Sequence, residues 1–173
     1  MFAASGRTTA AAYGSAVAGA LLPAEDPWAG YARTVVEIAG PEGTLTVRAA
    51  RPGAVGAWPW DTPDALFVMT AWDPGRARPG LEENRRRQAA LNEDVGRLTE
   101  ARWAAVGVDP ETGHREEGVV AGGLTEGQAL ALGARYRQDA VFRWAPDVWE
   151  IVACDGVRRV VLGWAASTLL RET

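Results

Sequence analysis

The sequence contains no lysine, one histidine and one cysteine, and these absences exclude several kinds of functional site. All 18 basic residues are arginine, so a lysine Schiff base, a lysine general base and a P-loop lysine are excluded. His114 is the only histidine and Cys154 the only cysteine. One chain therefore cannot supply a Cys/His zinc site or a site built from several histidines. Catalysis, if present, would depend mainly on carboxylates, arginines, amides and hydroxyls.

The chain also lacks an excess of basic residues and a long run of apolar residues. Its 173 residues carry a formal net charge of −4, which argues against nucleic acid as the main partner. No apolar stretch approaches the roughly 18–20 residues that cross a membrane. A lone cysteine cannot form an intramolecular disulfide and suits a reducing compartment. We therefore expect a cytoplasmic protein with no membrane partner.

Length and composition predict a single domain after a weakly structured lead-in. Residues 1–27 are rich in alanine but are diluted by Gly14 and Gly19, and they lack the charged start and strong apolar centre of a signal peptide. We expect this segment to be mobile or weakly helical. Residues 28–173 have the length of one domain and contain no internal linker.

The first half of the chain shows three strand patterns. β-branched residues at 34–38 and alternating residues at 44–49 predict a hairpin around the turn at 40–43. Residues 65–72 form a continuous apolar run, which indicates a strand covered on both faces. In the loop before this run, Trp58 or Trp60 is expected to close over the edge of the core.

The second half shows two helix patterns among shorter strands. Helical spacing of apolar residues predicts a helix over 81–99. Thr125 and Gln128 form a capping box that opens a second helix, ending near residue 138. The remaining strands are expected at 102–108, 115–121, 140–144, 149–153 and 157–164, the last two flanking the turn Asp155-Gly156.

Between residues 65 and 144 the expected elements follow the order β-α-β-β-α-β. This order is typical of the ferredoxin-like split βαβ arrangement, an antiparallel sheet with both helices on one face. We therefore predict an α+β fold with a ferredoxin-like core and a mostly antiparallel sheet. The N-terminal and C-terminal hairpins would be added to that sheet.

A functional site is predicted where the strand 65–72 ends and a loop leads into the helix 81–99. Asp73 follows the strand, and the amides and dipole of a helix N-terminus attract anions. The apolar stripe of the helix continues backwards onto Gln88 and Asn84, and an amide on a core-facing stripe needs hydrogen-bond partners. In the competing interpretation, Asp73 only forms a turn, and Glu82 and Glu83 only complement the helix dipole.

Other polar residues near these elements are less specific. Arg87 is the best placed of the arginines at 85–87 for an anion contact, although such a run is typical of a solvated helix face. Neighbouring strand residues face opposite ways, so only one of Glu116 and Glu117 can join a pocket. His114 is expected to be exposed near a glycine-containing turn, and Gln138 is either a helix cap or a pocket donor.

Four segments, in this order, resemble a known family. They are residues 67–74, Glu83-Asn84 with Arg87, 107–110 with Glu116-Glu117, and 136–142. Over about residues 31–149 the chain resembles the bacterial domain of unknown function 3293 family. The resemblance implies a compact bacterial domain and brings no established activity.

Three positions depart from the pattern of that family. Asp73 and Asp139 stand where the family usually has asparagine, and Arg137 stands where it usually has glycine or another small residue. An amide that becomes a carboxylate loses a hydrogen-bond donor and becomes an acceptor only. If the family site binds an anion, we expect that site to be altered in this chain.

These patterns together predict a pocket for a small polar or anionic ligand at the end of the strand 65–72. The residues expected to line it are Thr70, Trp72, Asp73, Glu83, Asn84, Arg87, Glu117 and Gln138. The sequence assigns no catalytic residue, metal ligand or cofactor, and a monomer and a homodimer are both compatible with it.

Two alternatives stand beside this prediction. The first is an enzyme that uses Asp73 with Glu83 or Glu117 as an acid–base pair, with or without Mg²⁺. The second is a protein-interaction or immunity-type module that uses an exposed loop around Trp58 and Trp60.

Overall fold

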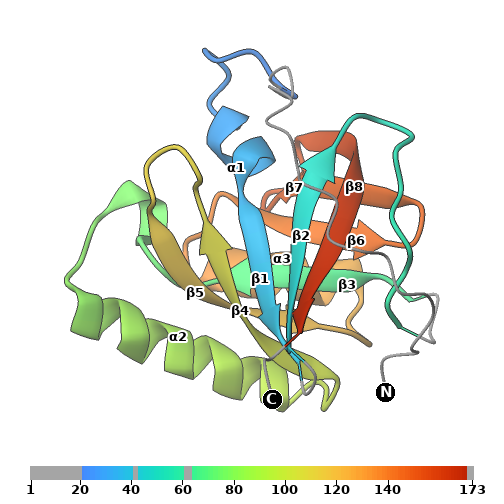
Figure 1. Ribbon diagram of the computed structural model, residues 1–173. Helices are drawn as coiled ribbons and strands as arrows, with labels where there is room; N and C mark the ends of the chain where they lie inside the picture. Colours follow the sequence, from blue (N-terminus) through green and yellow to red (C-terminus); the bar gives the residue numbers. More distant parts are fainter. Residues whose placement is uncertain (1–20, 41–42, 61–63, 171–173) are drawn as a thin grey trace.

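The computed structural model describes residues 21–40, 43–60 and 64–170. Within them, eight strands form one closed antiparallel barrel in the order β1-β2-β8-β7-β6-β3-β5-β4, with β4 again beside β1 (Figure 1). The strands are β1 (Val35–Ala39), β2 (Gly43–Ala50), β3 (Leu66–Thr70), β4 (Arg102–Val108), β5 (Arg115–Ala121), β6 (Ala140–Ala145), β7 (Val148–Ala153) and β8 (Arg159–Leu170). The helices are α1 (Ala29–Arg33), the short 3-10 helix η1 (Pro74–Arg76), α2 (Leu81–Gly96) and α3 (Glu126–Arg135).

The predicted ferredoxin-like α+β fold is therefore wrong. The strands and the two longer helices follow one another in the expected order, but the sheet has no free outer edges. The outer strand β4 pairs with β1, with Val36 opposite Gly107, while β6 continues through β7 and β8 to β2. The terminal hairpins thus bridge the two edges of the sheet. Closure gives the edge strands backbone hydrogen-bond partners.

Alternation along the strands builds one core inside the barrel and a second between the barrel and its helices. Leu66 and Val68 of β3 belong to the interior core. Phe67 and Met69 of the same strand pack in the outer core, which includes Leu91 of α2 and Leu132 of α3. Both faces of β3 are therefore covered, which explains its continuous apolar sequence.

A cluster of tryptophans fills part of the barrel interior. Trp144, Trp149 and Trp164 are each no more than 1% exposed. Within the described residues, the cluster comprises Trp58, Trp60, Trp103, Trp144, Trp149 and Trp164, with neighbouring ring centroids 5.0–6.1 Å apart. Trp58 and Trp60 close over the core, as the sequence suggested.

The two longer helices cover the outside of the barrel, and α2 lies along one side of it (Figure 1). A buried polar contact joins them: the Tyr136 hydroxyl, just after α3, donates to Asp94 of α2 at 2.7 Å. Arg97 and Arg135 also pair with Asp94, at 2.6 and 3.1 Å. No helix among the described residues has the length and apolarity needed to span a membrane.

The segment before β1 is attached to the barrel from residue 21 onward. Leu21 and Leu22 pack against the interior core. Asp26 pairs with Arg158 at 2.6 Å, and the Arg158 guanidinium lies 4.4 Å from the centre of the Trp28 ring. These contacts hold α1 at one end of the barrel. The rest of the predicted lead-in, residues 1–20, and the turn residues 41–42 lie outside the described residues.

Candidate functional site

A cavity of about 480 Å³ opens at the mouth of the barrel, beneath α1. The cavity and the tryptophan cluster lie at opposite ends of β4 and β6. Gly107 of β4 and Ala140 of β6 line the cavity, whereas Trp103 and Trp144, near the other ends of these strands, belong to the cluster. The strands supply Val36, Val68, Thr70, Ala105, Gly107, Glu116, Gly118, Ala140 and Phe142 to its wall. α1 and the loops supply Tyr31, Thr34, Trp72, Asp73, Arg78, Asp109, His114, Arg137, Gln138 and Asp139, among others.

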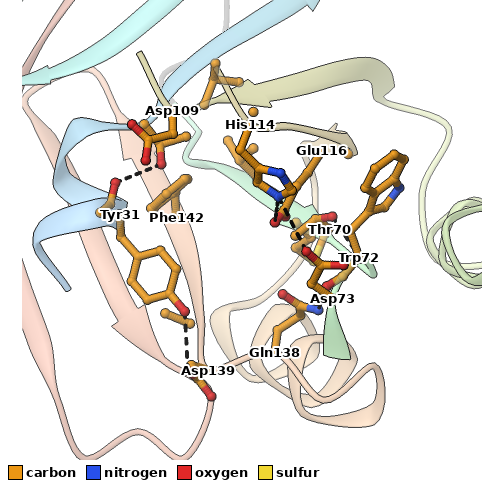
Figure 2. Close-up of a pocket in the computed structure, with 18 of the residues that line it drawn as sticks. Tyr31, Thr70, Trp72, Asp73, Asp109, His114, Glu116, Gln138, Asp139 and Phe142 are labelled. Atoms are coloured by element: carbon orange, nitrogen blue, oxygen red, sulfur yellow. Dashed lines mark hydrogen bonds and ion pairs between the residues drawn. The ribbon is translucent and has the colours of Figure 1, made fainter. Parts of the chain in front are cut away.

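Three polar side chains from separate segments meet on one wall of this cavity (Figure 2). His114 comes from the turn between β4 and β5, Glu116 from β5, and Asp73 from the loop after β3. The His114 Nε2 atom lies 3.0 Å from Glu116 Oε1 and 3.4 Å from Asp73 Oδ2. The three groups offer ligand atoms that all lie within 4.8 Å of one another. We call these residues the carboxylate–histidine cluster.

The cluster lies between the interior and solvent. The Asp73 and Glu116 side chains are 17% and 27% exposed, and that of His114 is 43% exposed. Burial raises the pKa of Glu116, the negative charge of Asp73 acts in the same direction, and hydrogen bonding with His114 opposes both. Water is partly excluded from this wall, so its charges interact more strongly than surface charges do.

The backbone that carries Asp73 is held by amides rather than by another strand. Because β3 ends at Thr70, the peptide groups that follow need other hydrogen-bond partners. Gln88 Oε1 accepts from the Ala71 N–H at 2.9 Å, and Asn84 Oδ1 accepts from the Asp73 N–H at 3.1 Å. Asn84 Nδ2 also donates to Asp73 Oδ1 at 2.9 Å. The amide half of the α2 stripe thus fixes the position of Asp73.

Two further predicted residues act on the same backbone. The Arg87 Nε atom donates to the carbonyl of Ala71 at 3.0 Å, and its Nη2 atom donates to the carbonyl of Tyr136 at 2.7 Å. The Gln138 Nε2 atom donates to the carbonyl of Trp72 at 2.7 Å. These side chains join the loop after β3 to the loop after α3, and Asp73 and Asp139 both reach the cavity from the joined loops.

The eight predicted site residues form three groups, according to where they lie relative to the cavity. Thr70, Trp72, Asp73 and Gln138 line the cavity. Asn84 and Arg87 lie behind it and support it. Glu83 and Glu117 face away, where they pair with Arg86 and Arg85 of α2. The structure therefore brings Asp73 together with Glu116, and not with either of the carboxylates that the enzyme alternative named.

His114 and Glu116 were absent from the predicted site. Glu116 lies opposite Gly107 and shares the interior face of β5 with Gly118 and Val120. Alternation showed that only one of the two glutamates could face a pocket, but the end of β5 is apolar on both faces. The sequence therefore contained no signal for which face is interior. His114 lies in a turn, where its type alone predicts exposure.

Two residues that line the cavity have a left-handed backbone. Asp73 has φ of 45° and Arg137 has φ of 61°. Glycine and asparagine adopt this conformation more readily than arginine does. The conformation serves to join the loops, because the Gly75 N–H donates to the Arg137 carbonyl at 2.7 Å.

Fold and site together define a small closed antiparallel barrel with a carboxylate-lined cavity at its mouth. The family model described as "Protein of unknown function (DUF3293)" matches residues 69–141 of the chain. This match confirms the resemblance seen in the sequence, over a shorter range than the 31–149 inferred there. It extends from the end of β3 into β6 and contains the whole carboxylate–histidine cluster. Comparison with curated proteins and with solved structures gives no match.

Proposed function

We propose that the protein binds a small molecule in the barrel-mouth cavity, with a cationic or hydrogen-bond-donating group facing Asp73 and Glu116. The observation that carries this proposal is the cavity of about 480 Å³, whose lining combines the carboxylate–histidine cluster with apolar and aromatic groups such as Val68 and Phe142. Small-molecule sites are typically concave, about 300–1,000 Å³ in volume, and mostly apolar with a few placed polar groups. The mouth of a barrel is a common place for them.

The charges of the lining favour a cation or a donor over an anion. The carboxylates in the lining are Asp73, Asp109, Glu116 and Asp139, and the guanidinium groups are Arg78 and Arg137. The pKa of Asp109 is lowered although burial acts to raise it, because the Glu111 backbone N–H and the Arg33 charge stabilise its charged form. Acidic groups thus predominate, and the anionic ligand considered from the sequence has less support than a cationic or neutral polar one.

Two aromatic side chains offer a surface for the apolar part of such a molecule. Tyr31 of α1 and Phe142 of β6 pack edge to face, with ring centroids 6.4 Å apart. The Tyr31 hydroxyl lies 3.4 Å from Asp139 Oδ2. Both side chains line the cavity across from the carboxylate–histidine cluster (Figure 2). A ring or short chain would remove this apolar surface from water.

The proposal is tested with three probes that share a ring and differ in head group: 2-phenylethylamine, 2-phenylethanol and phenylacetate. Saturation-transfer NMR on the wild-type chain should detect the amine most strongly, then the alcohol, and phenylacetate least. Ala105→Leu, which places a larger side chain in the cavity, should remove the signal. Ala104→Leu is the matched control, because Ala104 is the exposed neighbour on the same strand.

Equal signals for all three probes, or an amine signal that survives Ala105→Leu, would mean that the cavity is not the binding site. The same samples address a changed form of the enzyme alternative, in which Glu116, whose pKa is raised by burial, takes the place predicted for Glu83 or Glu117. An enzyme acting through Asp73 and Glu116 would convert a bound compound, and new resonances would appear with the wild type but not with Glu116→Gln. The alternative of an interaction loop has less support, because Trp58 and Trp60 pack into the tryptophan cluster.

A further inference from the structure

We infer that Asp73, His114 and Glu116 form a binding site for a divalent first-row transition metal ion. The three side chains come from separate segments, yet the His114 Nε2 atom lies 3.0 Å from one carboxylate oxygen and 3.4 Å from the other. This inference concerns the metal ion alone. It stands whether or not an organic molecule binds in the same cavity.

The separations match those between ligands of one ion. Zinc binds histidine nitrogen and carboxylate oxygen at about 2.0–2.2 Å. At angles between octahedral and tetrahedral values, these bond lengths place neighbouring ligand atoms about 2.8–3.6 Å apart. Two separations in the cluster already have these values, and all three are within 4.8 Å. The third separation, between the two carboxylates, is therefore no more than 4.8 Å.

The charge balance of the cluster differs from that of the other buried carboxylates. Within the described residues, Asp94 pairs with Arg97 and Arg135, and Glu150 pairs with Arg143 and Arg159. Asp73 and Glu116 share only the imidazole of His114 in their ion pairs among those residues. Two partly buried carboxylates without a guanidinium partner leave negative charge on this wall. A divalent cation would balance that charge.

The donor set selects the kind of metal. Magnesium and calcium take oxygen ligands, whereas an imidazole nitrogen suits zinc, iron, nickel and copper. One nitrogen and two oxygens therefore favour a transition metal over magnesium. Three protein ligands leave at least one coordination position open. That position would face the cavity, because all three residues line it.

A supporting layer for such a site is already present. Asn84 Nδ2 donates to Asp73 Oδ1, while Asp73 Oδ2 is the atom directed towards His114. The Asp73 N–H donates to the same Asn84 side chain, so Asn84 holds both the backbone and the carboxylate of Asp73. Hydrogen bonds of this kind orient metal ligands and commonly change metal affinity by about 10–100-fold when they are lost.

Calorimetric titration of the untagged chain with Zn²⁺ alone, and separately with Mg²⁺ alone, tests the inference. We expect one Zn²⁺ to bind per chain and at least about tenfold tighter than Mg²⁺. Glu116→Gln should weaken Zn²⁺ binding at least about tenfold, and the adjacent, outward-facing Glu117→Gln should leave it within about twofold. His114→Gln, at an exposed turn position, gives a second test that does not depend on the fold tolerating a change at Glu116.

Binding by the wild type that Glu116→Gln and His114→Gln leave unchanged would overturn the inference, as would no detectable Zn²⁺ binding. Because His114 is the only histidine in the sequence, its imidazole proton resonances give an independent readout. They should shift or broaden with Zn²⁺ in the wild type. Ala105→Leu should retain Zn²⁺ binding, so failure of the organic-ligand proposal and failure of the metal site are distinguishable.

Discussion

At the scale of single residues, Asn84 shows how a polar side chain can serve a site without lining it. The sequence indicated that its amide needs partners, and the structure places those partners on Asp73. One side chain accepts from the Asp73 backbone and donates to the Asp73 carboxylate. The same interpretation applies to Gln88, which accepts from the Ala71 N–H. The family-like motif therefore encodes the support of the site as much as the site itself.

Replacing Asn84 by alanine should destabilise the protein by about 1–3 kcal/mol, because a buried N–H loses its partner. Asn84→Asp separates the two roles. It keeps an acceptor for the Asp73 N–H but places a carboxylate against the Asp73 carboxylate, so it should also destabilise the fold near neutral pH. Urea denaturation measures both variants. If Asn84→Asp is as stable as the wild type, Asn84 does not hold Asp73 through its donor.

Arg137 has a left-handed backbone conformation that its residue type does not predict. Its φ of 61° is unfavourable for a residue with a Cβ atom. Arg137→Gly should therefore raise the free energy of unfolding by about 1 kcal/mol. Ala134→Gly, three residues earlier in the exposed face of α3, should lower it by about 1 kcal/mol. Urea denaturation measures the free energy of unfolding of both variants. A loss of stability in Arg137→Gly would show that the contacts of the Arg137 side chain stabilise the fold by more than its backbone conformation destabilises it.

At the scale of elements, local patterns were sufficient to place most strands and helices. The capping box is confirmed, since Thr125 Oγ1 accepts from the Gln128 N–H at 3.2 Å and Gln128 Oε1 accepts from the Thr125 N–H at 2.8 Å. The helix predicted over 81–99 ends at Gly96, and the strand predicted over 65–72 ends at Thr70. These patterns are visible because each depends on residues close in sequence.

The attachment of α3 to α2 gives a prediction about pH. Burial and then the hydrogen bond to Asp94 raise the pKa of Tyr136 to about 12. A tyrosine whose pKa is higher in the folded state stabilises the fold below its usual pKa of about 10, and this contribution is lost as the pH rises through about 12. Tyr136→Phe should cost about 1–3 kcal/mol at pH 7 through loss of a buried hydrogen bond.

The stability difference between wild type and Tyr136→Phe should therefore stay constant up to about pH 10 and shrink between about pH 10 and 12. Urea denaturation at pH 7, 10 and 11 follows this difference. A difference that does not change over this range would mean that Tyr136 ionises no differently in the folded and unfolded chains.

At the scale of the whole molecule, closure of the barrel is what the sequence did not reveal. The pairing that closes it joins Val36 of β1 to Gly107 of β4, residues far apart in the chain. A hairpin that extends an open sheet and one that bridges its two edges have the same local pattern. The error affected the site directly, because the cavity exists only where the closed sheet surrounds an interior. Closure places Val36 of β1 and Phe142 of β6 in the wall of the same cavity.

The central claim is that the barrel mouth is a binding site, and amide chemical-shift mapping tests it most directly. Backbone amide spectra of the labelled wild-type chain are recorded with 2-phenylethylamine and, separately, with Zn²⁺. We predict shifts concentrated at residues 70–73, 105–109, 114–118 and 137–142, with residues around the tryptophan cluster unaffected. Shifts confined to the outer face of α2 or to the loop at Trp58 and Trp60, or no shifts with either probe, would contradict it.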